Sequence, residues 1–158
     1  MTDVKRYSSR ISAVNYSVHC DDGLHTRDYS KASVILTGVS RSGKTPTSLY
    51  LALHFGIFAA NYPITDEELD SSKLPSALRD YKDRIYGLTI DPVRLQQIRS
   101  ERRPNSTYSD IGTCRYEVAQ VEQIYQANGV PFLNATAMSI EEISATIIQK
   151  LNINRELF

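Results

Sequence analysis

Residues 34–45 read VILTGVSRSGKT, and this stretch decides the fold of the chain. Its first four residues form a short apolar run, which is typical of a buried parallel strand. The next eight, residues 38–45, fit the phosphate-loop (P-loop) pattern GxxxxGK[ST] at every fixed position. Residues 45–55 then carry apolar side chains at helical spacing and end at Gly56. The pattern therefore lies between the strand and the helix that a phosphate-binding loop requires.

The loop has the chemistry that phosphate binding needs. Gly38 and Gly43 let the backbone turn tightly and come close to phosphate oxygens. Successive backbone N–H groups then form an anion-binding nest at the positive end of the following helix. Lys44 is expected to bridge the β-phosphate and the phosphoryl group in transit, and the Thr45 hydroxyl to hold Mg²⁺. The predicted nucleotide-binding residues of the loop are Gly38, Val39, Ser40, Arg41, Ser42, Gly43, Lys44 and Thr45.

Strand and helix patterns alternate along the rest of the chain. Capping-box patterns predict helix starts at Thr65 and Ser139, and Asp91 followed by Pro92 predicts another. Such alternation predicts an α/β fold of the P-loop kinase kind, with a mainly parallel sheet and helices on both faces. Besides residues 34–37, strands are predicted at 57–62, 85–90 and 130–133.

The N-terminal part is expected to lead into this domain. Val14, Tyr16 and Val18 alternate with polar residues, which predicts a strand over residues 10–18. The sequence DDG at 21–23 is a turn signal, and the polar residues after it predict a loop. We therefore expect residues 1–30 to be a strand and a loop, and residues 1–158 to be a single catalytic domain.

Three aspartates are candidates for catalysis or metal binding. Asp21 or Asp22 would serve as the general base for an acceptor hydroxyl, with an ordinary Asp-Gly turn as the alternative. Asp91 ends an apolar strand, as the metal-orienting acid of P-loop enzymes does, and a helix N-cap before Pro92 is the alternative. Glu117, like Arg115 in the same predicted helix, is expected on a solvated face, with a contact to the nucleotide or the target as the alternative.

Three arginines are candidates for contacts to phosphate. Arg41 lies inside the P-loop, where it would neutralise developing charge or contact a protein substrate, and a solvated loop arginine fits equally well. Arg102 and Arg103 lie beside a polar loop and would clamp a phosphate, although the end of a helix also favours solvated cations. Arg99, in the same predicted helix, is expected to face solvent.

The composition excludes several classes of protein. The chain has 158 residues, 41% of them hydrophobic and 23% charged, which is typical of a soluble globular domain. Its 18 basic and 18 acidic residues balance, so no strongly basic surface for nucleic acid is implied. No apolar run approaches membrane-spanning length and no signal-peptide pattern is present, so we expect a cytoplasmic protein without a membrane partner. The oligomeric state, a homo-oligomer included, stays open.

The cysteines and histidines suggest no further chemistry. Cys20 and Cys114 lie far apart without CxxC spacing, which argues against a disulfide scaffold or a zinc site. Cys114 begins a predicted helix and is expected to be inert. The three histidines, His19, His25 and His54, show no catalytic or metal-binding spacing.

Several blocks together resemble one family, the regulatory proteins of phosphoenolpyruvate synthase and of pyruvate, phosphate dikinase. The strongest block is SRSGKTPT at 40–47, followed by SLYLA at 48–52. Further blocks lie on both sides of it, in the same order as in the family and along nearly the whole chain: DDG at 21–23, AANYP at 59–63, GLTIDP at 87–92, ERRPNS at 101–106 and SIEEI at 139–143.

The resemblance implies an unusual bifunctional enzyme. It implies phosphorylation of a threonine on the target enzyme with ADP as donor and Mg²⁺ as cofactor, which inactivates the target. It also implies removal of that phosphate by inorganic phosphate, with release of pyrophosphate. The implied protein substrate is phosphoenolpyruvate synthase, with pyruvate, phosphate dikinase as the close alternative. Members of the family are longer, so the chain resembles their C-terminal catalytic portion, and Cys20 stands where they commonly have histidine or tyrosine.

Two other functions are compatible with a P-loop in a chain of this size. A small-molecule kinase would use ATP and a free acceptor. A nucleotide-sensing module would bind without chemistry and would lack carboxylates near the transferred phosphoryl group, where this sequence has candidates.

Overall fold

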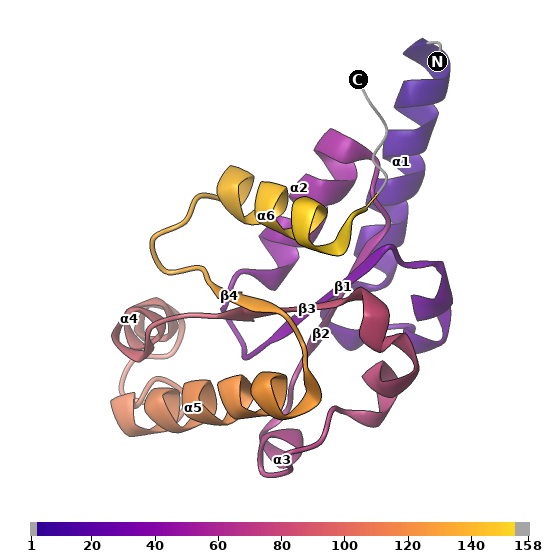
Figure 1. The fold of residues 1–158 in the computed structure, drawn as a ribbon. Helices are drawn as coiled ribbons and strands as arrows, with labels where there is room; N and C mark the ends of the chain where they lie inside the picture. The colour runs from indigo at the N-terminus through magenta and orange to yellow at the C-terminus, as the bar shows by residue number, and fades with distance from the viewer. Residues whose placement is uncertain (1–2, 154–158) are drawn as a thin grey trace.

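The sheet predicted from the sequence is present in the computed structural model, which describes residues 3–153 (Figure 1). Its four strands are all parallel, in the order β2-β1-β3-β4. The P-loop strand β1 is therefore central, with neighbours on both sides. The strands are β1 (Val34–Gly38), β2 (Ala59–Pro63), β3 (Ile85–Thr89) and β4 (Phe132–Asn134).

Helices cover both faces of the sheet, as predicted (Figure 1). Val34 and Leu36 of β1 pack with α2 and α6 on one face, whereas Ile35 between them packs with α4 and α5 on the other. This alternation follows from the two-residue period of a strand. The helices are α1 (Asp3–His19), α2 (Lys44–Phe55), α3 (Asp66–Leu69), α4 (Pro92–Arg102), α5 (Ile111–Asn128) and α6 (Ile140–Leu151), with 3₁₀ helices η1 (Asp21–Gly23), η2 (Thr26–Lys31) and η3 (Ser76–Arg84).

The N-terminal segment is a helix, so the strand predicted at residues 10–18 is wrong. Its buried residues Ala13, Tyr16, Ser17 and Cys20 recur at helical spacing, whereas Val18 is 59% exposed. This buried face packs against α2 and β2, and the Tyr16 ring stacks on Phe58 at 4.9 Å between centroids. Tertiary packing therefore overrides the local alternation of apolar residues.

Local capping signals were more reliable. Both predicted capping boxes are present: the Thr65 side chain accepts from the backbone of Glu68, and the Ser139 side chain from that of Glu142. Each cap satisfies N–H groups that the first turn of a helix leaves without partners.

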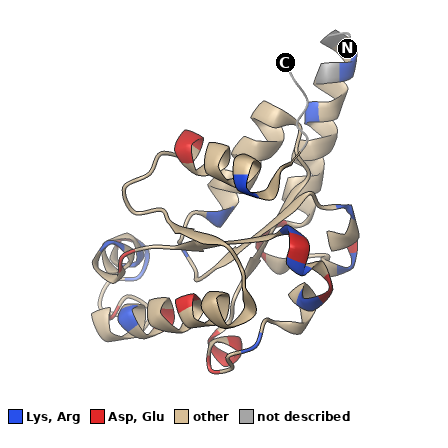
Figure 2. Ribbon diagram, in the orientation of Figure 1, with Lys and Arg blue, Asp and Glu red and all other residues tan. Residues whose placement is uncertain are grey.

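Charged residues of both signs are spread over the elements rather than sorted to one side (Figure 2). Among residues 3–153, no helix combines the length and apolarity that crossing a membrane would need.

A buried tyrosine ties the two central strands together where the P-loop begins. The Tyr125 hydroxyl of α5 lies 3.0 Å from the carbonyl oxygen of Thr37 in β1 and 2.9 Å from that of Leu88 in β3. Burial raises the pKa of Tyr125, so its hydroxyl stays a donor. Gly87 makes this contact sterically feasible, because a Cβ there would lie 2.5 Å from Cζ of Tyr125.

Candidate functional site

The P-loop joins the carboxyl end of β1 to the start of α2. Gly43 has φ +98° and Arg41 has φ +72°, and both conformations lie in the left-handed region. Alternation of left-handed with right-handed residues turns successive N–H groups toward one side, which is the geometry of an anion-binding nest. The strain at Arg41, a residue with a Cβ, is of order 1–3 kcal/mol and is typical of a ligand-binding loop.

Lys44 is buried within this loop. Only 4% of the residue is exposed, and its ammonium Nζ donates a 2.7 Å hydrogen bond to the carbonyl oxygen of Val39. Burial lowers the pKa of Lys44 to about 8, although the nearby carboxylates of Asp22 and Asp21 act in the opposite direction. A desolvated ammonium next to backbone amides interacts strongly with phosphate, because water screens it little.

The two aspartates before the P-loop have different surroundings. Asp21 Oδ1 accepts a 2.9 Å hydrogen bond from the Thr45 hydroxyl and a 2.6 Å bond from Asn61 Nδ2. The backbone N–H of Asp22 donates to Asn61 Oδ1 at 2.9 Å, which holds Asp22 in a left-handed conformation. Asn61, a fully buried residue of β2, therefore positions the whole turn. Sequence reasoning assigned it no role, although a polar residue inside an apolar strand pattern was a signal.

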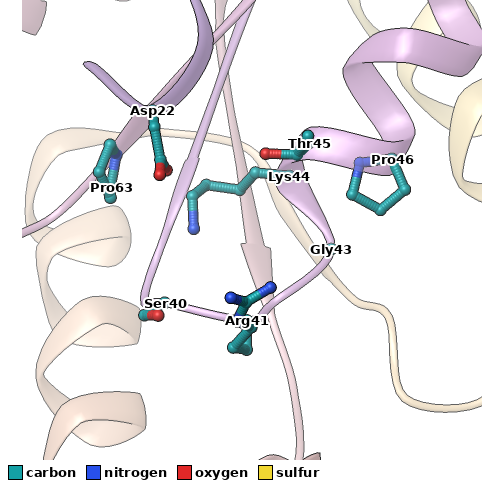
Figure 3. A pocket seen from close by; sticks show the side chains of 8 residues that line it. All are labelled: Asp22, Ser40, Arg41, Gly43, Lys44, Thr45, Pro46 and Pro63. Carbon is teal, nitrogen blue, oxygen red and sulfur yellow. The ribbon is translucent and has the colours of Figure 1, made fainter. Parts of the chain in front are cut away.

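The Asp22 carboxylate faces the cavity above the P-loop. It accepts no hydrogen bond from any residue between 3 and 153, and in Figure 3 it points toward the same space as the Lys44 ammonium. The Arg41 guanidinium points into this space from the opposite side (Figure 3). The cavity has a volume of about 460 Å³ and is lined by Asp22, Ser40, Arg41, Gly43, Lys44, Thr45, Pro46 and Pro63.

Arg99 is fully buried beneath the P-loop, so the expectation that it faces solvent is wrong. One terminal nitrogen donates to Glu117 Oε1 at 2.8 Å and to the carbonyl oxygen of Ser40 at 3.1 Å. The other donates to the carbonyl oxygen of Tyr108 at 3.1 Å. Glu117 is buried as well, not solvated, because it neutralises this guanidinium. We call Arg99 and Glu117 the buried ion pair.

The polar loop after α4 reaches the P-loop through Tyr108. Its hydroxyl lies 2.8 Å from Ser40 Oγ, and its ring lies 4.4 Å from the Arg99 guanidinium carbon. The guanidinium carbon of Arg103 lies 5.4 Å from the centroid of the same Tyr108 ring, and Arg103 is exposed. Arg102 is exposed too, and neither arginine lines the cavity.

Asp91 lies between β3 and α4 and is not among the residues that line the cavity. Its Oδ1 accepts a 2.8 Å hydrogen bond from Asn134 Nδ2, and its backbone N–H donates to the Thr136 hydroxyl at 2.8 Å. It precedes Pro92 at the N-terminus of α4, but its side chain makes no capping hydrogen bond. The structure therefore brings together Asp21, Asp22, Arg41 and Lys44, but not Asp91, Arg102 and Arg103.

The cysteines agree with the expectation from the sequence. Cys20 and Cys114 are both buried and neither forms a disulfide. Burial raises the pKa of the Cys114 thiol, and the nearby Arg99 only partly counteracts this. A thiol in this state is a poor nucleophile.

Comparisons with known proteins agree with the geometry. Residues 2–148 match the family described as kinase/pyrophosphorylase. A protein of Halorhodospira halophila that is named as a phosphoenolpyruvate synthase regulatory protein is 53% identical over 157 residues, and one of Legionella pneumophila with the same name is 52% identical over 157. A third, of Xanthomonas campestris pv. campestris, is 53% identical over 158 residues. The alignments cover 99–100% of this chain, which spans 58% of the length of each relative.

Proposed function

Because this chain belongs to the kinase/pyrophosphorylase family, we propose that it transfers phosphoryl groups to and from a threonine of phosphoenolpyruvate synthase. The forward reaction uses ADP as donor and inactivates the target, and the reverse reaction uses inorganic phosphate and releases pyrophosphate. The protein substrate is taken from the names of the relatives, which read phosphoenolpyruvate synthase regulatory protein.

One observation supports phosphoryl transfer over simple binding: a free carboxylate and a buried ammonium face the same cavity. Asp22 has no hydrogen-bond partner for its carboxylate among residues 3–153, so it is free to accept a proton. Lys44 provides the positive charge that a transferring phosphoryl group requires. A nucleotide sensor needs the Lys44 ammonium to bind phosphate but does not need the free Asp22 carboxylate.

The residues also suit the ligands that this chemistry needs. A cavity of about 460 Å³ lies in the range of small-molecule sites, and the P-loop amides and Lys44 suit a diphosphate. Thr45 Oγ1 and Asp21 Oδ1 lie 2.9 Å apart and are hard oxygen donors of the kind Mg²⁺ prefers. We assign Mg²⁺ to Thr45 and Asp21 rather than to Asp91, because the Asp21 carboxylate contacts Thr45, which lines the cavity, whereas the Asp91 carboxylate contacts Asn134, which does not. A bound Mg²⁺ would neutralise phosphate charge.

In the forward reaction, the threonine hydroxyl oxygen attacks the terminal phosphorus of ADP, and Asp22 accepts the proton of this hydroxyl. The bond between that phosphorus and the bridging oxygen breaks, so AMP leaves. Lys44 and Arg41 stabilise the charge that develops on the transferring group and on the leaving oxygen. Asn61 keeps the turn in place through Asp21 and the Asp22 backbone.

In the reverse reaction, an oxygen of inorganic phosphate attacks the phosphothreonine phosphorus. The bond between phosphorus and the threonine oxygen breaks, Asp22 returns a proton to that oxygen, and pyrophosphate leaves. Because the attacking phosphate takes the position of the AMP phosphate, the same loop and Lys44 serve both directions.

The proposal is tested with this chain, purified phosphoenolpyruvate synthase, and either ADP or ATP. With ADP as donor, and not with ATP, we expect one phosphothreonine on the target by mass spectrometry, loss of target activity, and one AMP released for each phosphoryl group transferred. Adding phosphate should then restore activity and release pyrophosphate. The Halorhodospira halophila relative is assayed in parallel, as the control for the part of its length that this chain does not span.

Other outcomes would reject the proposal. Turnover of ATP with a free small acceptor and an unmodified target would indicate a small-molecule kinase. Binding of ADP by this chain without transfer, in an assay where the Halorhodospira halophila relative does transfer, would indicate a nucleotide-sensing module.

The lowered pKa of Lys44 predicts how ADP binding depends on pH. Below about pH 8 the free protein holds Lys44 as an ammonium, and above it increasingly as an amine. The charged groups that act on it are Asp22, Arg99, Asp21 and Arg41. The dissociation constant for ADP should therefore rise between pH 8 and pH 9.5, approaching about tenfold per pH unit, because the phosphates are fully ionised there.

Titration calorimetry at several pH values measures this effect. Lys44→Arg provides the matched control, since arginine stays protonated over this range. A rise of equal steepness in Lys44→Arg would assign the pH dependence to another group.

A further inference from the structure

Two histidines and an aspartate meet beside the turn that carries Asp21 and Asp22. His19 ends α1, His25 precedes η2, and Asp28 lies within η2. His19 Nε2 lies 2.8 Å from Asp28 Oδ2, and the rings of His19 and His25 stack with centroids 3.8 Å apart. One potential ligand atom from each of the three residues lies within 4.8 Å of the other two.

We propose that His19, His25 and Asp28 form a binding site for one divalent transition-metal ion, of which Zn²⁺ and Ni²⁺ are the best candidates. Two imidazole nitrogens and one carboxylate oxygen are a donor set that favours these ions over Mg²⁺ or Ca²⁺. His25 and the side chains of His19 (44% exposed) and Asp28 (28% exposed) are accessible, so water can complete the coordination. This site is separate from the Mg²⁺ site at Thr45 and does not depend on the proposed function.

The spacing of 19, 25 and 28 in the sequence did not suggest a metal site. The chain reverses between these positions because Asp22 and His25 both take left-handed conformations, with φ +55° and +53°. This reversal brings His25 and Asp28 back over the end of α1. The three residues therefore meet through the fold and not through their spacing in the sequence.

Metal binding requires a small rearrangement of side chains. A metal ion takes the lone pair in the plane of each imidazole, whereas the two rings now lie at 7° to each other, face to face. The His25 ring has no hydrogen bond to another residue in the described range 3–153, so rotation about its side-chain bonds can tilt it toward Asp28. The ion would take the place of the hydrogen bond that now joins His19 Nε2 to Asp28 Oδ2.

A bound ion would link the end of α1 to η2 across the turn at 21–23. Asp21 contacts Thr45 from this turn, and Asp22 faces the cavity. The ion would therefore restrain the segment that carries both carboxylates. Amide hydrogen exchange of residues 20–28 should slow when the ion binds, while that of α6 should not change.

The test is a Zn²⁺ titration of the untagged chain by calorimetry, with excess Mg²⁺ present to occupy hard oxygen sites, and a parallel titration with Ni²⁺. We expect one ion per chain. His19→Ala, His25→Ala and Asp28→Asn should each weaken binding at least about tenfold. Loss of a group that only orients a metal ligand already costs about 10- to 100-fold in affinity, so loss of a ligand should cost no less. His54→Ala, on α2, is the matched control and should bind as the wild type does. Circular dichroism checks that each variant is folded.

The small number of histidines gives a second, independent measurement. The chain has three, so Zn²⁺ should shift the ring NMR signals of His19 and His25 and leave those of His54 unchanged. No saturable binding, equal binding in all three ligand variants, or a shift of His54 alone would each overturn the proposal and leave His19 and Asp28 as an ordinary surface pair.

Discussion

Replacing Lys44 by alanine should reduce phosphoryl transfer by about 10³-fold or more, the size of effect that a cation on the transferring group has in other phosphotransferases. The reason is its position, since Lys44 combines almost complete burial with direct contact to the P-loop backbone. Transfer to the target is measured in single-turnover reactions with ADP, so that binding and chemistry are separated. The phosphate-dependent reverse reaction should fall by a similar factor if one loop serves both directions.

The same substitution should not destabilise the fold. The folded-state pKa of Lys44, about 8, lies below its ordinary value of 10.5, so folding disfavours the charged form. Below pH 8 this group therefore lowers the stability of the wild type relative to its stability above pH 10.5. Removing the charge should leave the melting temperature equal or higher at pH 7.

Lys82→Ala removes an exposed lysine from η3 and is the matched control, which should keep full activity. Retained transfer in Lys44→Ala would place the chemistry elsewhere. A large fall in its melting temperature would instead mean that lost activity reports unfolding.

Breaking the buried ion pair should have the largest effect on stability. Glu117→Ala leaves the Arg99 guanidinium buried without its carboxylate partner, and such a change costs about 3–5 kcal/mol. A domain of this size has a free energy of unfolding of about 5–15 kcal/mol, so the loss is a large fraction of the total. The melting temperature should fall by about 10 °C. Arg99→Met should cost less, because the Glu117 side chain is 11% exposed and can reach water.

The double variant separates stability from positioning. Arg99→Met with Glu117→Leu replaces both charges by apolar groups and should recover most of the lost stability. It cannot restore the hydrogen bonds from Arg99 to the carbonyl oxygens of Ser40 and Tyr108. We therefore expect weaker ADP binding in a protein that is again stable.

Chemical denaturation and calorimetry measure the two effects. Arg115→Ala, an exposed charge deletion on the same helix α5, is the control and should change neither. Wild-type affinity for ADP in the stable double variant would show that Arg99 contributes to the fold but does not position the P-loop.

Most of the fold could be predicted because its signals are local. The apolar run before Gly38, the capping boxes at Thr65 and Ser139, and the turn at Gly56 each act within a few residues. The first helix could not be predicted in this way, because the contacts of Tyr16 that stabilise it come from Phe58, about forty positions away. The alternation of Val14, Tyr16 and Val18 favours a strand, but this packing stabilises a helix more strongly.

The candidate site divides in the same manner. The backbone conformation of residues 38–45 was predictable, because the left-handed φ that an anion-binding nest requires is determined locally by Gly43 and its neighbours. The division of roles between the two aspartates was not, since it depends on Asn61 from another strand. Arg99 was misjudged because a charge in a helix usually faces water, and its buried partner Glu117 lies on a different helix.

The sequence by itself thus determined the P-loop, the parallel α/β fold around it and the family, because glycine positions, strand runs and helix caps act through neighbouring backbone. Only the tertiary structure decided that Asp22 faces Lys44 while Asp21 is bonded to Thr45, that Arg99 supports the loop from below, and that two histidines meet Asp28. Each of these depends on side chains that are distant in the chain, and their free energies arise from burial and contact, which exist only once the elements have packed.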